Sequence, residues 1–97
     1  MRIVAVTACP TGIAHTYMAA EQLEKTAKKL GHSIRVETQG AMGIENELSQ
    51  TDIDAADVAI IATDIALERP ERFERIRKVE VPVQAALKDP EGIFRKI

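Results

Sequence analysis

The sequence is poor in the residue types and patterns that mark secreted and membrane-spanning proteins. Cys9 is the only cysteine among the 97 residues, so no internal disulfide can form. No uninterrupted apolar run approaches the roughly 18 residues of a membrane span, and no charged segment followed by an apolar one opens the chain as a leader would. These absences disfavour secretion and membrane insertion, and they predict a cytosolic protein with a reduced thiol.

An excess of one charge is also lacking. Thirteen Lys and Arg residues stand against fifteen Asp and Glu residues, which leaves a net charge of −2. Neither sign gathers into a long block that could follow nucleic acid or a lipid surface. His, Cys and carboxylate residues do not cluster at the spacings of a zinc or magnesium site. The sequence therefore predicts no nucleic-acid partner, no metal and no cofactor.

Aromatic residues are scarce, and tryptophan is absent. The aromatic side chains are those of Tyr17, Phe73 and Phe94. A core must therefore be built mainly from Val, Ile, Leu and Ala, as in layered α/β proteins. With 97 residues, 45% of them hydrophobic, the chain fits one small globular domain over residues 1–97.

Four runs of residues predict a parallel sheet. Arg2–Ala8 and Val58–Ala62 are continuously apolar, which is typical of strands covered on both faces. Ser33–Gln39 and Val79–Val81 alternate between apolar and polar residues, which indicates strands nearer the edges. Right-handed crossovers between these strands then predict a three-layer α/β/α sandwich with a four-stranded parallel sheet of order 2-1-3-4.

The remaining segments predict helices and loops. An amphipathic pattern runs from Ile13 to Leu30, and Gly31 can end that helix in the left-handed conformation. Residues 82–87 and 90–97 each begin with proline and can form short helices. Residues 41–50 are ambiguous between a loop and a loop that enters a short helical piece near residues 46–48.

Two further segments are rich in charged or polar residues. Thr51–Asp54 can cap a single helical turn. Glu68–Lys78 mixes both charges around Phe73 and Ile76, so we expect a solvated face there, with partner docking as the less favoured alternative.

The most informative segment joins the first strand to the first helix. Cys9 follows the apolar strand at the carboxyl edge of the predicted sheet, next to a helix N-terminus, where unpaired N–H groups and a partial positive charge favour a thiolate or a phosphoryl group. Gly12 allows the backbone to approach an anion closely. The sequence therefore predicts phosphoryl chemistry on the sulfur of Cys9, with a phosphate-binding loop formed by Pro10, Thr11, Gly12, Ile13, Ala14, His15 and Thr16.

Several of these residues also have ordinary structural interpretations. His15 can contact phosphate, or it can cap or pack against the first helical turn. Thr11 and Thr16 can donate to phosphate oxygens or act as helix caps. Gln39 and Gly40 lie at the carboxyl end of the second predicted strand, where they can form the rim of the site or only a turn.

These residues carry a resemblance to a known family. The segment from Val4 to Glu21, VAVTACPTGIAHTYMAAE, is followed further on by Val36-Glu37-Thr38-Gln39-Gly40. Together they resemble the IIB domain of the fructose-type phosphotransferase system (PTS) of bacteria. The resemblance extends over nearly the whole chain and includes Arg72-Phe73 and Val81-Pro82-Val83.

The resemblance implies an activity and partners. In that family a cysteine, here Cys9, accepts a phosphoryl group from a phosphohistidine on a IIA protein. It then donates the group to a sugar, fructose by default, that is carried by a membrane IIC protein. The resemblance also implies a cytoplasmic location, at the inner face of the membrane when the domain is bound to a IIC partner.

Two other functions remain open from the sequence. The loop also resembles the Cys-x5-Arg loop of low-molecular-weight tyrosine phosphatases, which leaves a small phosphatase or arsenate-reductase-like enzyme as an alternative. His15 stands where that loop has its arginine, however, and an imidazole grips phosphate less well than a guanidinium does. The second alternative is a regulatory or interaction module in which Cys9 is inert.

Overall fold

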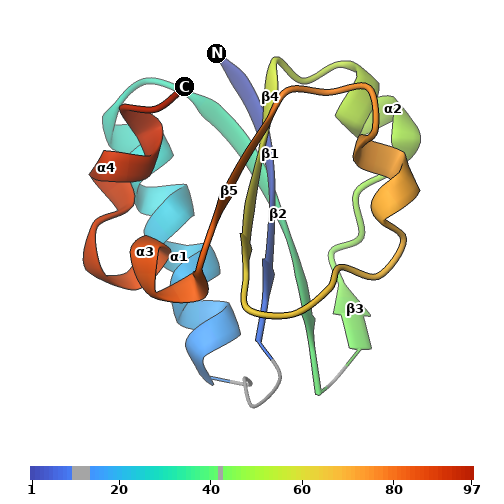
Figure 1. The fold of residues 1–97 in the computed structure, drawn as a ribbon. Coiled ribbons are helices and arrows are strands. Elements are labelled where there is room, and N and C mark those ends of the chain that lie inside the picture. Colours follow the sequence, from blue (N-terminus) through green and yellow to red (C-terminus); the bar gives the residue numbers. More distant parts are fainter. Residues whose placement is uncertain (10–13, 42) are drawn as a thin grey trace.

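The architecture is built on one five-stranded mixed sheet. A computed structural model of the chain describes residues 1–9, 14–41 and 43–97. The strand order is β3-β2-β1-β4-β5, with β1 at the centre between β2 and β4 (Figure 1). The pairs β1–β2, β1–β4 and β4–β5 are parallel, and β3 runs antiparallel to β2. The strands are β1 (Arg2–Ala8), β2 (Ser33–Gly40), β3 (Gly43–Glu45), β4 (Val58–Thr63) and β5 (Lys78–Val81).

The prediction of a four-stranded, all-parallel sheet is wrong. The four expected strands are present and have the expected neighbours, but β3 adds a fifth, antiparallel strand beside β2. Gly40 pairs with Gly43, whose φ of 84° lies in the region that favours glycine, so the chain can reverse direction tightly there. The helical piece considered near residues 46–48 is also absent, since Asn46 has a φ of 54° and helix α2 begins only at Gln50.

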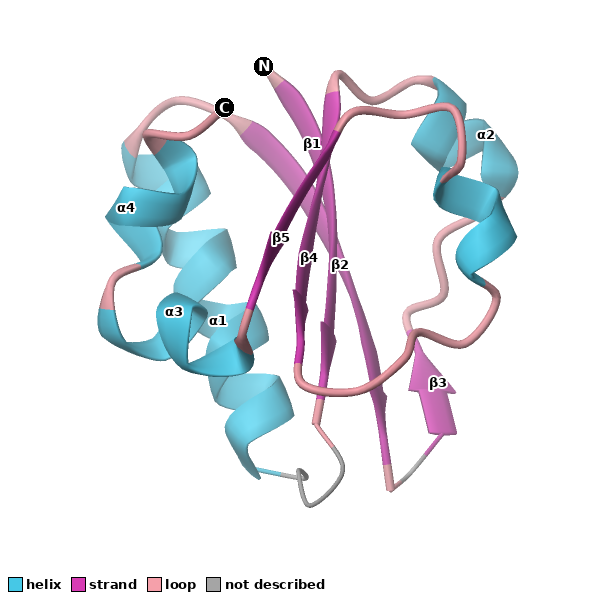
Figure 2. Cartoon of the chain, viewed as in Figure 1, coloured by secondary structure: helices cyan, strands magenta, loops and turns pink. Residues whose placement is uncertain are grey.

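Helices cover both faces of the sheet. Figure 2 shows α1, α3 and α4 together on one side and α2 on the other, so the layers are helix, sheet and helix, as predicted. The single turn of 3-10 helix η1 lies beside α2. The elements are α1 (Ala14–Lys29), α2 (Gln50–Asp54), η1 (Pro70–Phe73), α3 (Val83–Lys88) and α4 (Pro90–Phe94).

Helix α1 ends as its sequence predicts. Gly31 has a φ of 81°, and its N–H donates to the Lys28 carbonyl at 3.1 Å. The N–H of His32 donates to the Ala27 carbonyl at 2.8 Å. This pair of hydrogen bonds is a Schellman motif, which satisfies carbonyl groups that the helix end would otherwise leave unpaired.

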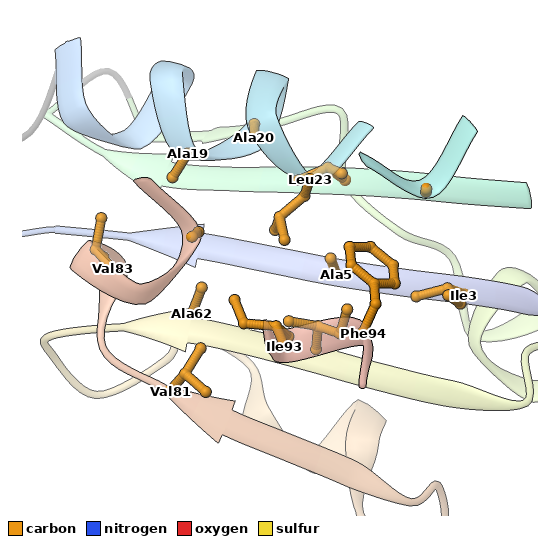
Figure 3. Close-up of a cluster of buried hydrophobic side chains, with 14 of the residues drawn as sticks. Ile3, Ala5, Ala19, Ala20, Leu23, Ala62, Val81, Val83, Ile93 and Phe94 are labelled. Carbon is orange, nitrogen blue, oxygen red and sulfur yellow. The ribbon is translucent and has the colours of Figure 1, made fainter. Parts of the chain in front are cut away.

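The core lies on both faces of β1. Ile3 and Ala5 pack against the α1 side, and Val4 and Val6 pack against the α2 side. This alternation explains why the strand is continuously apolar, because both of its faces are covered. Figure 3 shows the larger cluster, in which α1, α3 and α4 contribute Ala19, Ala20, Leu23, Val83, Ile93 and Phe94.

Strand β2 is not the edge strand with one wet face that its alternation suggested. Its last three residues, Thr38 to Gly40, pair with β3, and the stretch from Val36 to Gln39 is buried. Glu37 is 0% exposed although it carries a carboxylate. A cationic partner from a distant segment must therefore satisfy Glu37, and that partner lies close to the candidate site.

Candidate functional site

Cys9 lies at the carboxyl edge of the parallel sheet. It is the residue after β1, its side chain is 6% exposed, and α1 begins at Ala14 shortly beyond it. After β1 the chain forms β2 on one side of it, and the later strands β4 and β5 lie on the other side of β1. Cys9 therefore lies at the point where the strand order reverses, which is where open α/β sheets bind their ligands.

A hollow of about 250 Å³ opens beside the thiol. Three segments form its lining: the residue after β1, the end of β2 with the residue after it, and the segment after β4. The lining residues are Cys9, Gln39, Gly40, Ala41, Ile65, Ala66 and Glu68. A larger hollow of about 540 Å³ lies over the outer part of β2, but Cys9 does not line it. The smaller hollow is the candidate site because Cys9, the predicted nucleophile, lines it.

The structure brings some of the predicted phosphate-loop residues to this edge. Residues 10–13 (Pro10 to Ile13) lie outside the described residues. Ala14 and His15 are exposed on the first turn of α1, which leaves the His15 ring accessible from solvent. Gln39 and Gly40, predicted as possible rim residues, line the same hollow as Cys9.

Thr16 is the buried member of the loop set. Its side chain is 2% exposed, and its backbone carbonyl accepts a hydrogen bond from the Thr7 hydroxyl at 3.0 Å. Within residues 1–9, 14–41 and 43–97, the hydroxyls of Thr16 and Thr38 have no hydrogen-bond partner. Buried hydroxyls are nearly always satisfied in folded proteins. The Thr16 hydroxyl, in the first turn of α1, is therefore an unusual group, a buried donor without a partner among the described residues.

A buried ion pair supports the wall of the hollow. Arg72, from η1, donates from Nη1 to Glu37 Oε1 at 2.7 Å and from Nη2 to Glu37 Oε2 at 3.0 Å. The two side chains are 5% and 0% exposed. Leu48 adds a backbone N–H to Glu37 Oε1 at 2.8 Å. Such a bidentate pair is among the stronger polar contacts in a protein.

These contacts set the charge state of Glu37. Burial acts to raise the pKa of the carboxyl, but hydrogen bonds from Arg72, Gln39 and Leu48, together with the charge of Arg72, hold the pKa below its ordinary value. The hydrogen bond that Arg72 donates to Glu37 raises the pKa of Arg72 despite its burial. Both groups are therefore charged at neutral pH.

Gln39 connects the ion pair to the hollow. Its Nε2 donates to Glu37 Oε2 at 2.7 Å and to the Glu68 carbonyl at 3.1 Å. Its Oε1 accepts the Glu68 backbone N–H at 2.8 Å. Glu37 and Gln39 are two residues apart on a strand, so their side chains share a face and both point toward η1. One amide thus bridges β2 and the segment after β4.

Sequence reasoning missed this network. The expectation of a solvated face over Glu68–Lys78 is wrong for Arg72, which is buried against Glu37. The available signal was the pair Glu37 and Gln39, two polar residues on one face of a strand just before the predicted ligand edge. Nothing in the local pattern pointed to Arg72 as their partner.

Two broader features of the described part of the chain limit the chemistry. No group of three or more His, Cys, Asp or Glu side chains in it is arranged to hold a metal ion. No helix in the same residues is both long enough and apolar enough to cross a membrane.

Comparison with known proteins identifies the family. Residues 4–96 match the family described as the PTS system, Lactose/Cellobiose specific IIB subunit. The chain is 49% identical over 96 residues to the PTS system fructose-like EIIB component 2 of Escherichia coli K12, covering 99% of this chain and 91% of that protein. It is 47% identical over 94 residues to the PTS system 2-O-alpha-mannosyl-D-glycerate-specific EIIABC component of Escherichia coli K12, covering 97% of this chain and 14% of that protein.

A solved structure gives the same result. The crystal structure of a predicted fructose-specific IIB from Escherichia coli matches with a TM-score of 0.95 at 48% identity, over 99% of this chain and 85% of that one. The sheet order and the cysteine at its carboxyl edge define an α/β protein of the IIB class. The chain belongs to the IIB family of the sugar phosphotransferase system, as its cysteine loop and Glu-Thr-Gln-Gly stretch had indicated.

Proposed function

We propose that this chain is a phosphoryl carrier in which Cys9 accepts a phosphoryl group from a phosphohistidine on a IIA protein and donates it to a sugar bound by a membrane IIC protein. The observation that carries the proposal is the placement of the chain's only cysteine at the carboxyl edge of the sheet, in a hollow beside a helix N-terminus. Membership in the IIB family supports the same assignment.

The first step forms the sulfur–phosphorus bond. The Cys9 thiolate attacks phosphorus in line with the leaving imidazole nitrogen, the P–N bond breaks, and the imidazole retains the electron pair and takes up a proton. The N-terminus of α1, the Thr16 hydroxyl and His15 are the proposed donors to the phosphoryl oxygens, and the sequence motif from Pro10 to Ile13 is proposed to take part in phosphate binding as well.

The second step returns the thiolate. A sugar hydroxyl oxygen attacks phosphorus, the S–P bond breaks, and the hydroxyl proton passes to a base of the assembled complex. The thiolate is a good leaving group at a helix N-terminus because the helix dipole stabilises its charge. The relatives' names include fructose-like and 2-O-alpha-mannosyl-D-glycerate-specific systems, so the proposed acceptor is fructose or a related sugar.

The partner assignment rests on relatives that combine the three functions. The EIIABC relative is named for A, B and C components in one protein, and this chain matches 14% of it. We therefore propose that the present domain works between a IIA donor and a IIC acceptor, and that it acts at the inner face of the membrane when bound to IIC.

The test is phosphorylation of the purified chain. Wild type and Cys9→Ser are each incubated with labelled phosphoenolpyruvate, the general phosphotransferase proteins and a IIA protein. We expect label on the wild type alone, in a linkage that is stable to alkali and cleaved by iodine, as a thiophosphate is. A Cys9→Ala variant should also remain unlabelled, because neither replacement supplies a thiolate.

Other outcomes would point elsewhere. Release of phosphate from an aryl phosphate, without label on the protein, would replace the carrier with a hydrolase. Absence of both activities would leave a regulatory module. The hydrolase is less favoured because the position six residues after Cys9 is His15, and its imidazole is a weaker clamp for the transition state than a guanidinium.

A further inference from the structure

We propose that Gln39 is a positioning residue: its side-chain amide, oriented by the buried Glu37–Arg72 ion pair, holds the wall of the Cys9 hollow formed by residues 65–68. The consequence for phosphoryl transfer rests on the proposed function. The positioning itself does not, because the contacts and their test involve no phosphoryl donor.

The wall is a segment without helix or strand that is tied down at its two ends. At its start, the Asp64 N–H donates to the Ala8 carbonyl at 3.2 Å, and Asp64 Oδ1 accepts the Val83 N–H at 3.1 Å. At its end, Gln39 both accepts the Glu68 N–H and donates to the Glu68 carbonyl. Between these ties, Leu67 packs partly buried against the smaller apolar cluster, whereas Ile65 is 41% exposed and has little burial to hold its side chain in place.

The amide of Gln39 is itself held in one orientation. Its Nε2 faces the Glu37 carboxylate at 2.7 Å, and only the NH₂ end of an amide can donate to a carboxylate. The carbonyl end must then point toward the Glu68 N–H, as observed. Arg72 clamps both carboxylate oxygens and also donates to the Glu68 carbonyl at 3.3 Å. The ion pair therefore decides which way the amide points, and the two Gln39 bonds, together with the longer one from Arg72, hold residue 68.

This arrangement matters because Cys9 and the wall share one small hollow. A phosphoryl group on sulfur must lie in line with its donor or acceptor, and a misplacement of about 1 Å can slow such a step by around a hundredfold. A wall that moved would also admit water and reagents to a thiol that is 6% exposed. Gln39 controls both effects through the position of the wall.

The test compares Gln39→Met with Gln50→Met. Methionine keeps the length of the side chain and removes the amide. Gln50 is the matched control, because its amide also donates to η1, at the Arg72 carbonyl, but within the described part of the chain forms no hydrogen bond with residues 65–68. Hydrogen exchange of the Glu68 amide and alkylation of Cys9 by iodoacetamide are measured on folded protein at neutral pH.

We expect both rates to rise about tenfold in Gln39→Met and to stay near wild type in Gln50→Met. Without the amide, the closed position of the wall loses its hydrogen bonds to Gln39, so the wall opens locally more often. Exchange of the Ile60 amide, in the inner strand β4, should not change. With a working transfer assay, kcat for acceptance should fall about ten- to a hundredfold while KM for the IIA donor changes little.

Unchanged exchange at Glu68 and unchanged alkylation of Cys9 in Gln39→Met would overturn the proposal, as would an equal rise in both variants. If Gln39→Met does not fold, Gln39→Asn serves instead, since it keeps a polar amide on β2 and shortens the side chain by one methylene group. A wild type that accepts no phosphoryl group would refute the proposed function alone, because the exchange and alkylation results stand without it.

Discussion

At the scale of single residues, the chain places its strongest ion pair in the interior and not at the surface. Taking a carboxylate and a guanidinium out of water is unfavourable, and their attraction offsets that penalty only when the geometry is good and the remaining atoms are hydrogen-bonded. Glu37 and Arg72 meet both conditions, since both Glu37 oxygens accept at least two bonds. Removal of either partner would leave the other charge buried and unpaired.

Replacement of Glu37 should therefore change stability in a pH-dependent way. The pKa of Glu37 lies below its ordinary value of 4.5 in the folded protein. Its contribution is then present above pH 4.5 and lost as the pH falls through the lower folded-state pKa. We expect Glu37→Gln to lower the free energy of unfolding by about 3–5 kcal/mol at pH 7, and by less in acid. Urea unfolding from pH 7 down to pH 3 measures this difference.

The control for this prediction is Glu80→Gln on the exposed edge strand β5, which should change stability by no more than about 0.5 kcal/mol. A difference between wild type and Glu37→Gln that stays constant with pH would contradict the assignment. The double variant Glu37→Met/Arg72→Met should lose less stability than the sum of its two single variants, because it leaves no unpaired charge.

At the scale of elements, the short helix α2 depends on its cap. Ser49 Oγ accepts the Asp52 N–H at 3.0 Å, and the Ser49 N–H donates to Asp52 Oδ2 at 3.2 Å, which completes a capping box. A helix of five residues has no stability of its own in water. The cap and the burial of Ile53 must therefore hold α2 over the sheet.

We expect Ser49→Ala to lower the free energy of unfolding by about 1 kcal/mol, within a range of about 0.5–2, because the Asp52 N–H loses its partner. Ser33→Ala is the matched control, since Ser33 is also exposed but starts a strand and caps no helix. Equal effects of the two substitutions in urea unfolding would show that the capping box contributes nothing.

The elements also show where sequence patterns predict structure and where they do not. The continuous apolar runs predicted β1 and β4 correctly, because a strand covered on two faces needs apolar residues at every position. Gly31 predicted the end of α1, since the left-handed conformation is a local requirement. Strand β3 was missed because three residues carry too little periodicity to be recognised, and their pairing with β2 is what makes them a strand.

At the scale of the whole molecule, stability comes from two apolar clusters on opposite faces of one sheet. The larger cluster joins β1 and β4 to α1, α3 and α4 (Figure 3). Leu23 lies fully buried in it, at 0% exposure, whereas Leu30 at the end of the same helix is 45% exposed. The same residue type therefore has two different environments in one segment.

Leu23→Ala should lower the free energy of unfolding by about 2–5 kcal/mol, because it removes buried methyl groups and leaves a cavity in a close-packed core. Leu30→Ala, the matched control, should change it by no more than about 0.5 kcal/mol. Urea unfolding checks both values, provided that the dependence of the unfolding free energy on urea concentration is the same in the variants as in the wild type. Similar losses for the two variants would mean that the cluster is not packed as described.

The sequence by itself determined the order of the main strands and helices, the position of Cys9 at the carboxyl edge of the sheet, and the resemblance that the family comparison confirmed. These features depend on local periodicity, turn residues and a contiguous motif. Only the tertiary structure decided that Arg72 is buried against Glu37, 35 residues away, and that Gln39 joins that pair to the wall of the hollow. A local pattern shows which residues share a face, whereas the partner of a buried charge is chosen by the packing of segments far apart in the chain.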